Sequence, residues 1–358
     1  MWTSPLVILI PRMKKILLSI LICITSSSCG DNGTSILDYF SNVVILKDEI
    51  CVTDSCVAPQ NLVLKDYSLF YKEKSQSKLL RRLDLITGEI QEFLSKGNGP
   101  GEVTNVIRLA VSDSILQVYT DPEAVLYYYP ADLDKNLVYP SKEVKMPLGQ
   151  SAFASAFEVN GKLFYSGKIT LTDTCRYCVY DIDKDSLYSF EGFPKIDSSI
   201  QDFPSNDMSK QLAYQGDFVF SPNRDRLFFF FFYGLGFEII DTRNWKVLYH
   251  KMYQYPDVKL KHIDQLNINK VERNPNSLCG FIDACATDNH IYVLYTNKTF
   301  KEDYSSGRHI LQFDWEGKPI THYISENDLN SISIDDSENN IYATTNEENA
   351  RIIKYKIR

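Results

Sequence analysis

Short, mainly apolar runs recur along the chain, and they come in groups of three. In one group, residues 106–111, 115–120 and 124–129 are apolar runs separated by turns that contain Asp or Pro. Apolar runs of about 4–8 residues bounded by turn residues are typical of β-strands that pack in the interior of a protein. The pattern therefore predicts three consecutive strands joined by short turns.

The same grouping occurs six times along the chain. The copies are residues 64–90, 106–133, 151–187, 214–250, 279–320 and 329–357. A repeat of roughly 35–50 residues is typical of β-propellers and similar arrays. Because one group cannot bury both of its faces alone, the groups must close into a ring. The sequence therefore predicts an all-β fold, a six-bladed β-propeller, with seven blades as the alternative.

Closure of such a ring requires a strand from one end of the chain in the blade formed by the other end. Residues 43–46 (VVIL) are the candidate outer strand, and residues 351–357 are its expected neighbour. Residues 228–232, a run of five Phe, predict a buried central strand. Two polar segments, residues 202–214 and 259–271, are expected to form short helices between blades. We expect residues 43–358 to form a single propeller domain.

The N-terminal segment has the organisation of a secretory signal. A basic start at Met13-Lys14-Lys15 precedes an apolar stretch, residues 16–24, which a small-residue region follows. An apolar stretch this short is typical of signal peptides and not of membrane-spanning helices. We predict that residues 1–28 are a signal peptide whose natural start is Met13, with residues 1–12 upstream of it. The alternative is that the apolar residues 6–10 lengthen the signal.

The small residues before Cys29 resemble a bacterial lipobox, although Ser26 stands where Leu is usual. The resemblance implies that Cys29 is acylated and becomes the first mature residue, with residues 29–42 as a lipidated tether. Several acyl chains on one residue anchor a protein firmly, since each buried methylene contributes about 0.8 kcal/mol. The implied location is the bacterial cell envelope, on the periplasmic or surface face of the outer membrane. The alternative is ordinary cleavage that leaves Cys29 a thiol.

Composition narrows the classes of partner. The 358 residues carry a net charge of −8, and 44% of them are hydrophobic. A large apolar fraction predicts a folded core. A negative net charge argues against a general nucleic-acid binder, which needs a basic face for the phosphates. We expect no nucleic acid among the partners.

Six further cysteines form three local pairs: Cys51/Cys56, Cys175/Cys178 and Cys279/Cys285. An exported protein can keep disulfides, so each pair is a candidate bridge. Partly buried thiols and a zinc or redox site are the alternatives. The CxxC spacing of the second pair lacks the second CxxC or His pair of a zinc site.

Other catalytic and metal-binding patterns are absent from the sequence. The five His residues show no metal-ligand spacing, and no Gly-x-Ser-x-Gly motif occurs. Residues 335–340 (DDSENN) offer carboxylate and amide oxygens, which suit calcium, but they do not match the EF-hand pattern. We expect no metal or other cofactor, with calcium at this loop as the alternative.

One glycine-rich motif supports a resemblance to a known family. Gly97, Gly99, Gly101 and Glu102 lie in the stretch KGNGPGE, and the strand LQVY follows at residues 116–119. With the repeats and the lipobox, this motif resembles a Bacteroidetes family of TolB-like six-bladed β-propeller lipoproteins. The resemblance implies fold and location, and no catalytic residue. The loop itself is either a tight structural turn or a ligand loop whose N–H groups bind an anion.

Two functions follow from these observations. The favoured one is a lipid-anchored binding or scaffold module for an envelope protein, a peptide or a glycan, without catalysis. The alternative is a propeller enzyme, a hydrolase or lyase acting on a glycan or lactone, with carboxylates or a metal at the central channel. A titratable cluster at the axis would favour the enzyme, whereas an apolar patch on one face would favour the scaffold.

Overall fold

The computed structural model describes residues 35–47, 49–73, 77–112, 114–132, 139–146, 155–166, 175–193, 213–263, 268–345 and 350–357. The chain divides into two units, Met1–Tyr39 and Phe40–Arg358. In the first unit, the described part is a short 3-10 helix, η1 (Ile36–Tyr39). The predicted signal peptide and Cys29 lie outside the described residues, as does most of the helix predicted at 202–214.

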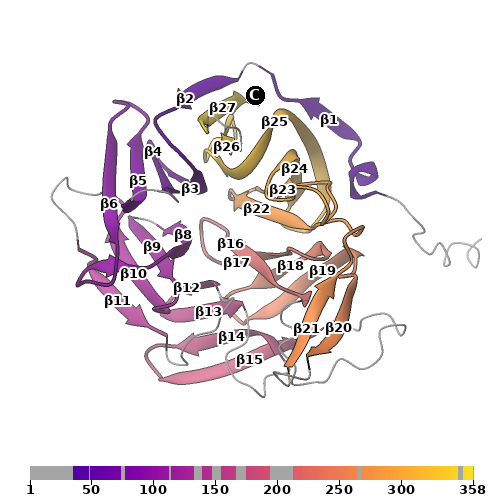
Figure 1. Ribbon diagram of the computed structural model, residues 1–358, viewed down its shortest axis with the longest axis horizontal. Coiled ribbons are helices and arrows are strands. Elements are labelled where there is room, and N and C mark those ends of the chain that lie inside the picture. The colour runs from indigo at the N-terminus through magenta and orange to yellow at the C-terminus, as the bar shows by residue number, and fades with distance from the viewer. Residues whose placement is uncertain are drawn as a thin grey trace, which may run out of the picture. The chain divides into compact units, whose positions relative to one another are not determined.

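Within the unit Phe40–Arg358, groups of antiparallel strands follow one another around a ring (Figure 1). The first four groups are separate sheets, and each is a blade whose first strand lies innermost. The first blade contains β3 (Pro59–Lys65), β4 (Ser68–Glu73), β5 (Lys78–Asp84), β6 (Ile90–Lys96) and β7 (Glu102–Val103), and the second contains β8 (Val106–Ser112), β9 (Ile115–Thr120), β10 (Val125–Pro130) and β11 (Lys142–Lys145). The third blade contains β12 (Ser155–Val159), β13 (Lys162–Ser166), β14 (Cys175–Asp181) and β15 (Ser186–Gly192). The fourth contains β16 (Gly216–Phe220), β17 (Arg226–Phe231), β18 (Leu235–Asp241) and β19 (Lys246–Gln254).

The last two blades share one eight-stranded sheet. Its strands are β22 (Phe281–Ala286), β23 (His290–Tyr295), β24 (Gly307–Asp314), β25 (Pro319–Ile334), β26 (Asn340–Thr345) and β27 (Ile352–Lys356), with β1 (Asn42–Ile45) and β2 (Ile50–Thr53). The first half of β25 pairs mainly with β24 and is an outer strand of the fifth blade. Its second half pairs with β26 and is the innermost strand of the sixth. The described strands therefore form six blades, as the repeats predict, and the seven-blade alternative is set aside.

The ring closes through N-terminal strands, as predicted, but the strand that pairs with β27 was predicted incorrectly. Residues 43–46 were expected beside 351–357, whereas β1 pairs in parallel with β25, where Val43 lies opposite His322. The neighbour of β27 is β2, which pairs with it antiparallel. Both segments are short and apolar, so the sequence pattern does not distinguish them. Two strands from the start of the chain thus hold the last two blades.

The second strand of a blade is buried on both faces, because neighbouring blades pack face to face. In β9, β17, β23 and β26 every residue after the first is buried. The side chains of Phe228, Phe229, Phe230 and Phe231 are at most 2% exposed, which confirms the predicted buried strand for these four residues. Phe232, the last of the run, is half-buried and follows the end of β17. Burial of one such side chain contributes about 1.5–3 kcal/mol, so these strands hold the blades together.

The helix predicted at residues 259–271 is wrong. This part of the chain is a two-stranded antiparallel hairpin, β20 (Val258–Ile263) and β21 (Ile268–Arg273). Residues 258–261 (VKLK) alternate apolar and basic residues, and alternation with a period of two is the pattern of a strand. The polar character of the segment obscured this alternation.

Candidate functional site

Six polar side chains, one from the innermost strand of each blade, form a connected group around the axis. This axial ring comprises Asn61 (β3), Arg108 (β8), Ser155 (β12), Asp217 (β16), Asp283 (β22) and Ser331 (β25). Figure 1 shows the inner strands around the centre of the ring of blades. The ring therefore links all six blades where they approach one another most closely.

Arg108 is the centre of the axial ring. Its Nε lies 3.2 Å from Asp217 Oδ2, and its Nη1 lies 2.9 Å from Asp283 Oδ1. The three residues are only 8%, 7% and 3% exposed. Nη1 also donates a long hydrogen bond of 3.5 Å to Asn61 Oδ1. Removal of one partner from a buried ion pair costs about 3–5 kcal/mol when it leaves an uncompensated charge.

Burial affects the two kinds of charge in this ring differently. Burial raises the pKa of Asp217 above its usual value, and the Arg108 charge only partly opposes this. For Arg108, burial alone would lower the pKa, but the charges of Asp217 and Asp283 outweigh it and the pKa is raised. Arg108 thus stays positive, while Asp217 takes up a proton more readily than a carboxyl in water.

Irregular strand pairing places four of the ring residues. The strand register shifts between Val106 and Arg108, between Phe281 and Asp283, and between Leu329 and Ser331. A further shift in β3 spans Asn61, whose φ of 52° lies in the left-handed region. A β-bulge adds a residue to one strand and reorients the side chains around it. The bulges thus aim polar side chains of apolar strands towards the axis.

A cavity of about 360 Å³ lies at the axis, and all six innermost strands line it. Asn61 and Arg108, near the starts of their strands, form its floor, because its other lining residues lie nearer the strand ends. Phe157, Phe218 and Phe220 give it an aromatic wall on the side of β12 and β16. The cavity therefore combines an aromatic wall with a charged, buried floor.

Arg224, in the turn after β16, extends across part of this cavity. Its Nη2 donates a 2.7 Å hydrogen bond to the carbonyl of Val111 at the end of β8, two blades away. The guanidinium also lies over the ring of Phe220, 4.9 Å from its centroid. Because the connection runs from the fourth blade to the second, it covers the cavity on the side of the third.

The ring carboxylates already have partners within the protein. Asp217 Oδ1 accepts the N–H of Phe218 at 2.8 Å. Asp283 Oδ2 accepts the Ser331 hydroxyl at 2.6 Å and the Ile332 N–H at 2.8 Å. Their remaining oxygens face Arg108. Carboxylates converge on the axis, as the enzyme alternative requires, but each is engaged in holding Arg108.

The glycine-rich loop lies away from this cavity. It begins at Lys96, the end of β6, at the end of the blade opposite the cavity because β6 runs antiparallel to β3. Glu102 Oε2 accepts the Gly99 N–H at 3.0 Å, and a Cβ at Gly97 would lie 1.9 Å from this oxygen. Gly101 has a φ of +75°. The Glu102 carboxylate thus binds a loop amide, and anion binding by this loop stays a prediction.

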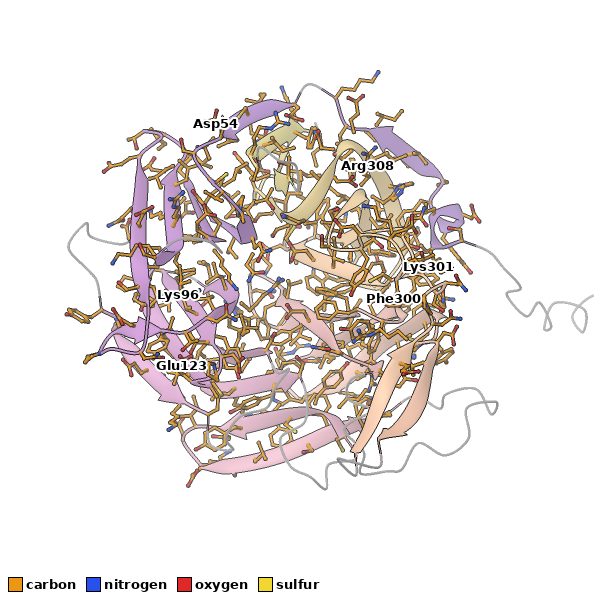
Figure 2. The ribbon with its side chains drawn as sticks, in the orientation of Figure 1. Asp54, Lys96, Glu123, Phe300, Lys301 and Arg308 are labelled. Carbon is orange, nitrogen blue, oxygen red and sulfur yellow. The ribbon has the colours of Figure 1, made fainter. Side chains whose placement is uncertain are left out.

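Figure 2 labels Lys96 and Glu123, which flank the loop. The Glu123 carboxylate accepts the N–H of Thr104 at 2.8 Å and so connects the loop to the turn between β9 and β10. The loop is therefore fixed from both sides by carboxylates of the chain itself.

The predicted cysteine pairs lie in three different blades. Cys51, Cys56, Cys279 and Cys285 are thiols in the structure, and Cys178 Sγ lies 3.0 Å from Ser189 Oγ, whereas Cys175 is half-buried in the same strand. Burial raises the pKa of Cys56 and Cys279 to about 12. Such thiols are protonated at neutral pH and are poor nucleophiles. Disulfide formation stays a prediction.

Residues 335–340 form the turn between β25 and β26. Asp335 Oδ1 accepts the N–H of Asn339 at 2.8 Å, and Glu338 binds the His290 ring and the Thr287 hydroxyl. In the described part of the chain, no group of three or more His, Cys, Asp or Glu is placed to hold a metal. No described helix is long and apolar enough to cross a membrane.

Sequence reasoning missed the axial ring, although a local signal for it exists. Arg108, Asp217 and Asp283 are each a charged residue near the start of an otherwise apolar inner strand. A charge at such a position requires a buried partner. The sequence does not show which partners meet, because each comes from a different blade.

Comparisons with known proteins agree with this architecture. A family model described as TolB-like 6-blade propeller-like matches residues 86–337. Among solved structures, a member of the DUF4221 family from Bacteroides vulgatus is 12% identical with a TM-score of 0.57, covering 87% of this chain and 97% of that chain. An auxiliary nutrient binding protein from Bacteroides thetaiotaomicron is 10% identical with a TM-score of 0.50, covering 84% and 70%. Such identities show a shared fold alone. No curated protein matches the sequence.

Proposed function

The chain belongs to the TolB-like six-blade propeller family, and on that premise we propose that it is a binding module whose recognition site is the axial cavity. The observation that carries this proposal is the cavity of about 360 Å³ to which every blade contributes. Its volume falls at the small end of the range of about 300–1,000 Å³ that is typical of ligand sites. The site suits a small molecule, or one end group of a peptide, protein or glycan.

The comparisons support a binding role without identifying the ligand. One neighbour of the same fold is described as an auxiliary nutrient binding protein. Propellers in general bind their partners at the ends of the central channel, where loops from all the blades meet. We therefore favour a binding module over a purely structural protein.

The enzyme alternative rests on the carboxylates at the axis. A glycoside hydrolase needs one carboxyl group as acid and a second as base or nucleophile. Here Asp217 and Asp283 both pair with Arg108, and their other oxygens accept hydrogen bonds from the protein. This arrangement fixes an arginine more readily than it activates water, so binding is the better-supported function.

A ligand panel read by thermal unfolding tests the proposal. The panel contains uncharged sugars, sugar phosphates, amino acids, dipeptides and small organic acids, with wild type and Ala286→Trp compared. Ala286 is half-buried and lines the cavity, so an indole there fills it. At least one class is expected to raise the Tm of wild type but not of Ala286→Trp, because a ligand stabilises only the state that binds it.

The matched control is Ala58→Trp. Ala58 is also half-buried, but it precedes β3 at the opposite end of the inner strand and does not line the cavity. This variant should respond to ligand like wild type. A panel without any effect on wild type would contradict the binding role. Conversion of a bound ligand to product, followed by NMR, would favour the enzyme.

Export and lipid anchoring remain part of the proposal. The signal-like segment ending at Ser28 and the lipobox-like Cys29 support an envelope location. Cys29→Ala should shift the protein from the membrane fraction to the soluble envelope fraction, with its fold unchanged. Persistence of Cys29→Ala in the membrane fraction would contradict lipid anchoring.

A further inference from the structure

We propose that the axial cavity binds an uncharged carbohydrate ring, packed against Phe220 and hydrogen-bonded to Arg108. This inference rests on the proposed binding function and names the chemical class of its ligand. The lining of the cavity supports it in three respects: charge, hydrogen-bonding capacity and aromatic surface.

The charges around the cavity nearly cancel. Three cations face four carboxylates: Lys65, Arg108 and Arg224 against Asp217, Asp283, Asp288 and Asp336. The deepest cation, Arg108, already has two carboxylate neighbours, so it is a poor site for a phosphate or carboxylate ligand. The oxygens of Asp217 and Asp283 are likewise engaged, which leaves a ligand amine without a deep counter-ion. An uncharged ligand fits this balance best.

The floor still offers hydrogen-bond donors. A guanidinium carries five N–H groups. In Arg108, Nε and Nη1 face the carboxylates of Asp217 and Asp283, and Nη1 also donates the long hydrogen bond to Asn61. Within that same part of the chain, no hydrogen bond from its Nη2 is found. Because Arg108 is 92% buried and lines the cavity, a ligand that accepts hydrogen bonds would satisfy a donor that is costly to leave unpaired. Sugar hydroxyls accept and donate, and they carry no charge.

The wall supplies the complementary apolar surface. Phe220 is half-buried at the cavity, and its ring is edge-on to Phe218, with centroids 5.5 Å apart. The face of an aromatic ring is slightly negative, so it attracts the weakly positive C–H bonds on one face of a sugar ring. Because the Arg224 guanidinium lies over one face of the Phe220 ring, the sugar would pack against the other face. A wholly apolar ligand would leave Arg108 without acceptors. The pairing of an aromatic wall with a neutralised polar floor thus distinguishes a sugar from lipids, anions and amines.

Binding to the full-length protein in detergent, measured by isothermal titration, tests this inference. The uncharged probes are methyl glycosides of glucose, galactose, mannose and N-acetylglucosamine. The charged probes are glucose 6-phosphate, glucuronate, lysine and glutamate. At least one methyl glycoside should bind wild type more tightly than any charged probe. Ala286→Trp should abolish that binding.

Phe220→Leu tests the aromatic contact without leaving a large void. Affinity for the bound glycoside should fall roughly tenfold, the size expected for loss of an aromatic contact. Tyr188→Leu, on the exposed outer strand β15, removes an aromatic ring far from the cavity lining and should leave affinity unchanged. Equal affinities for wild type and Phe220→Leu would overturn the proposed packing.

The outcomes separate this inference from the function on which it rests. Binding of a charged probe in place of the glycosides, abolished by Ala286→Trp, would keep the binding module and overturn the carbohydrate ligand. Glycoside binding that survives Ala286→Trp would place the sugar elsewhere and also overturn it. If no probe of any class binds wild type, the carbohydrate ligand is overturned, and the binding function then fails only if the broader panel of the thermal unfolding experiment is also without effect.

Discussion

Two of the buried arginine–carboxylate clusters in the described part of the chain lie in different surroundings. The axial ring holds Arg108 between two carboxylates beneath the cavity. The second cluster lies between the third and fourth blades, where Arg176 Nη2 is 2.6 Å from Glu238 Oε1. Tyr177 and His250 bind the same carboxylate, each at 2.5 Å. Similar residues therefore occur in two different surroundings.

The two clusters differ in how fully their carboxylates are compensated. Burial raises the pKa of Glu238, but hydrogen bonds from His250, Arg176 and Tyr177 outweigh it, so the pKa is lowered overall. For Asp217 burial prevails and the pKa is raised. We call the Arg176–Glu238 cluster saturated, because the partners of its carboxylate outweigh the effect of burial, and it stabilises the contact between two blades. The axial ring is less saturated in this sense, and it adjoins the axial cavity. Burial of charge alone thus does not identify a binding site, and an adjoining cavity is required as well.

The largest expected effect is that of removing the charge from the saturated cluster. Glu238→Gln leaves Arg176 without its buried counter-ion and should destabilise the fold by about 3–5 kcal/mol. Urea denaturation measures this loss. Glu191→Gln is the matched control, because Glu191 lies 3.9 Å from the same arginine but is 43% exposed. A surface pair of this kind contributes about 0–1 kcal/mol, and equal losses in the two variants would contradict the comparison.

The pH dependence of Glu238 provides a second test. Its folded pKa is below the ordinary value of 4.5, so its contribution is present above pH 4.5 and is lost as pH falls through the folded pKa. Tm measured from pH 6 downward should therefore fall less steeply in Glu238→Gln than in wild type. Parallel curves would show that Glu238 is not held charged by the fold.

A smaller effect is expected in the axial ring. Asp217→Asn leaves Arg108 paired with Asp283, one charge against one, and should cost on the order of 1 kcal/mol. Because the folded pKa of Asp217 is raised, its contribution to stability decreases as pH rises from 3.8 through the folded pKa. The deficit of Asp217→Asn relative to wild type should accordingly shrink over that window. A loss as large as that of Glu238→Gln would show that the ring is as saturated as the other cluster.

The smallest expected effect on stability is that of adding or removing calcium. Both clusters are compensated by protein groups, and Asp335 and Glu338 in the acidic turn accept protein hydrogen bonds. Addition of calcium or of EDTA should leave the Tm of wild type unchanged. A calcium-dependent rise that Asp336→Asn removes would establish the calcium alternative, since Asp336 is the exposed carboxylate of that turn.

The blades could be predicted from the sequence because each strand corresponds to a short apolar run of its own. The apolar runs around residues 106–120 and 228–232 coincide with strands β8, β9 and β17. The identity of the closing strand could not be predicted, since residues 43–46 and β2 have the same local pattern. The axial ring could not be assembled either. Arg108 and Asp283 belong to different blades, and only closure of the ring brings them within 2.9 Å.

The most direct test of the account is a crystal structure of the protein grown with the methyl glycoside that binds most tightly. We predict a sugar ring in the axial cavity, with its C–H face on Phe220 and a hydroxyl within hydrogen-bond distance of Arg108. A sugar bound elsewhere, with the axial cavity filled by solvent, would contradict the claim that this cavity is the recognition site.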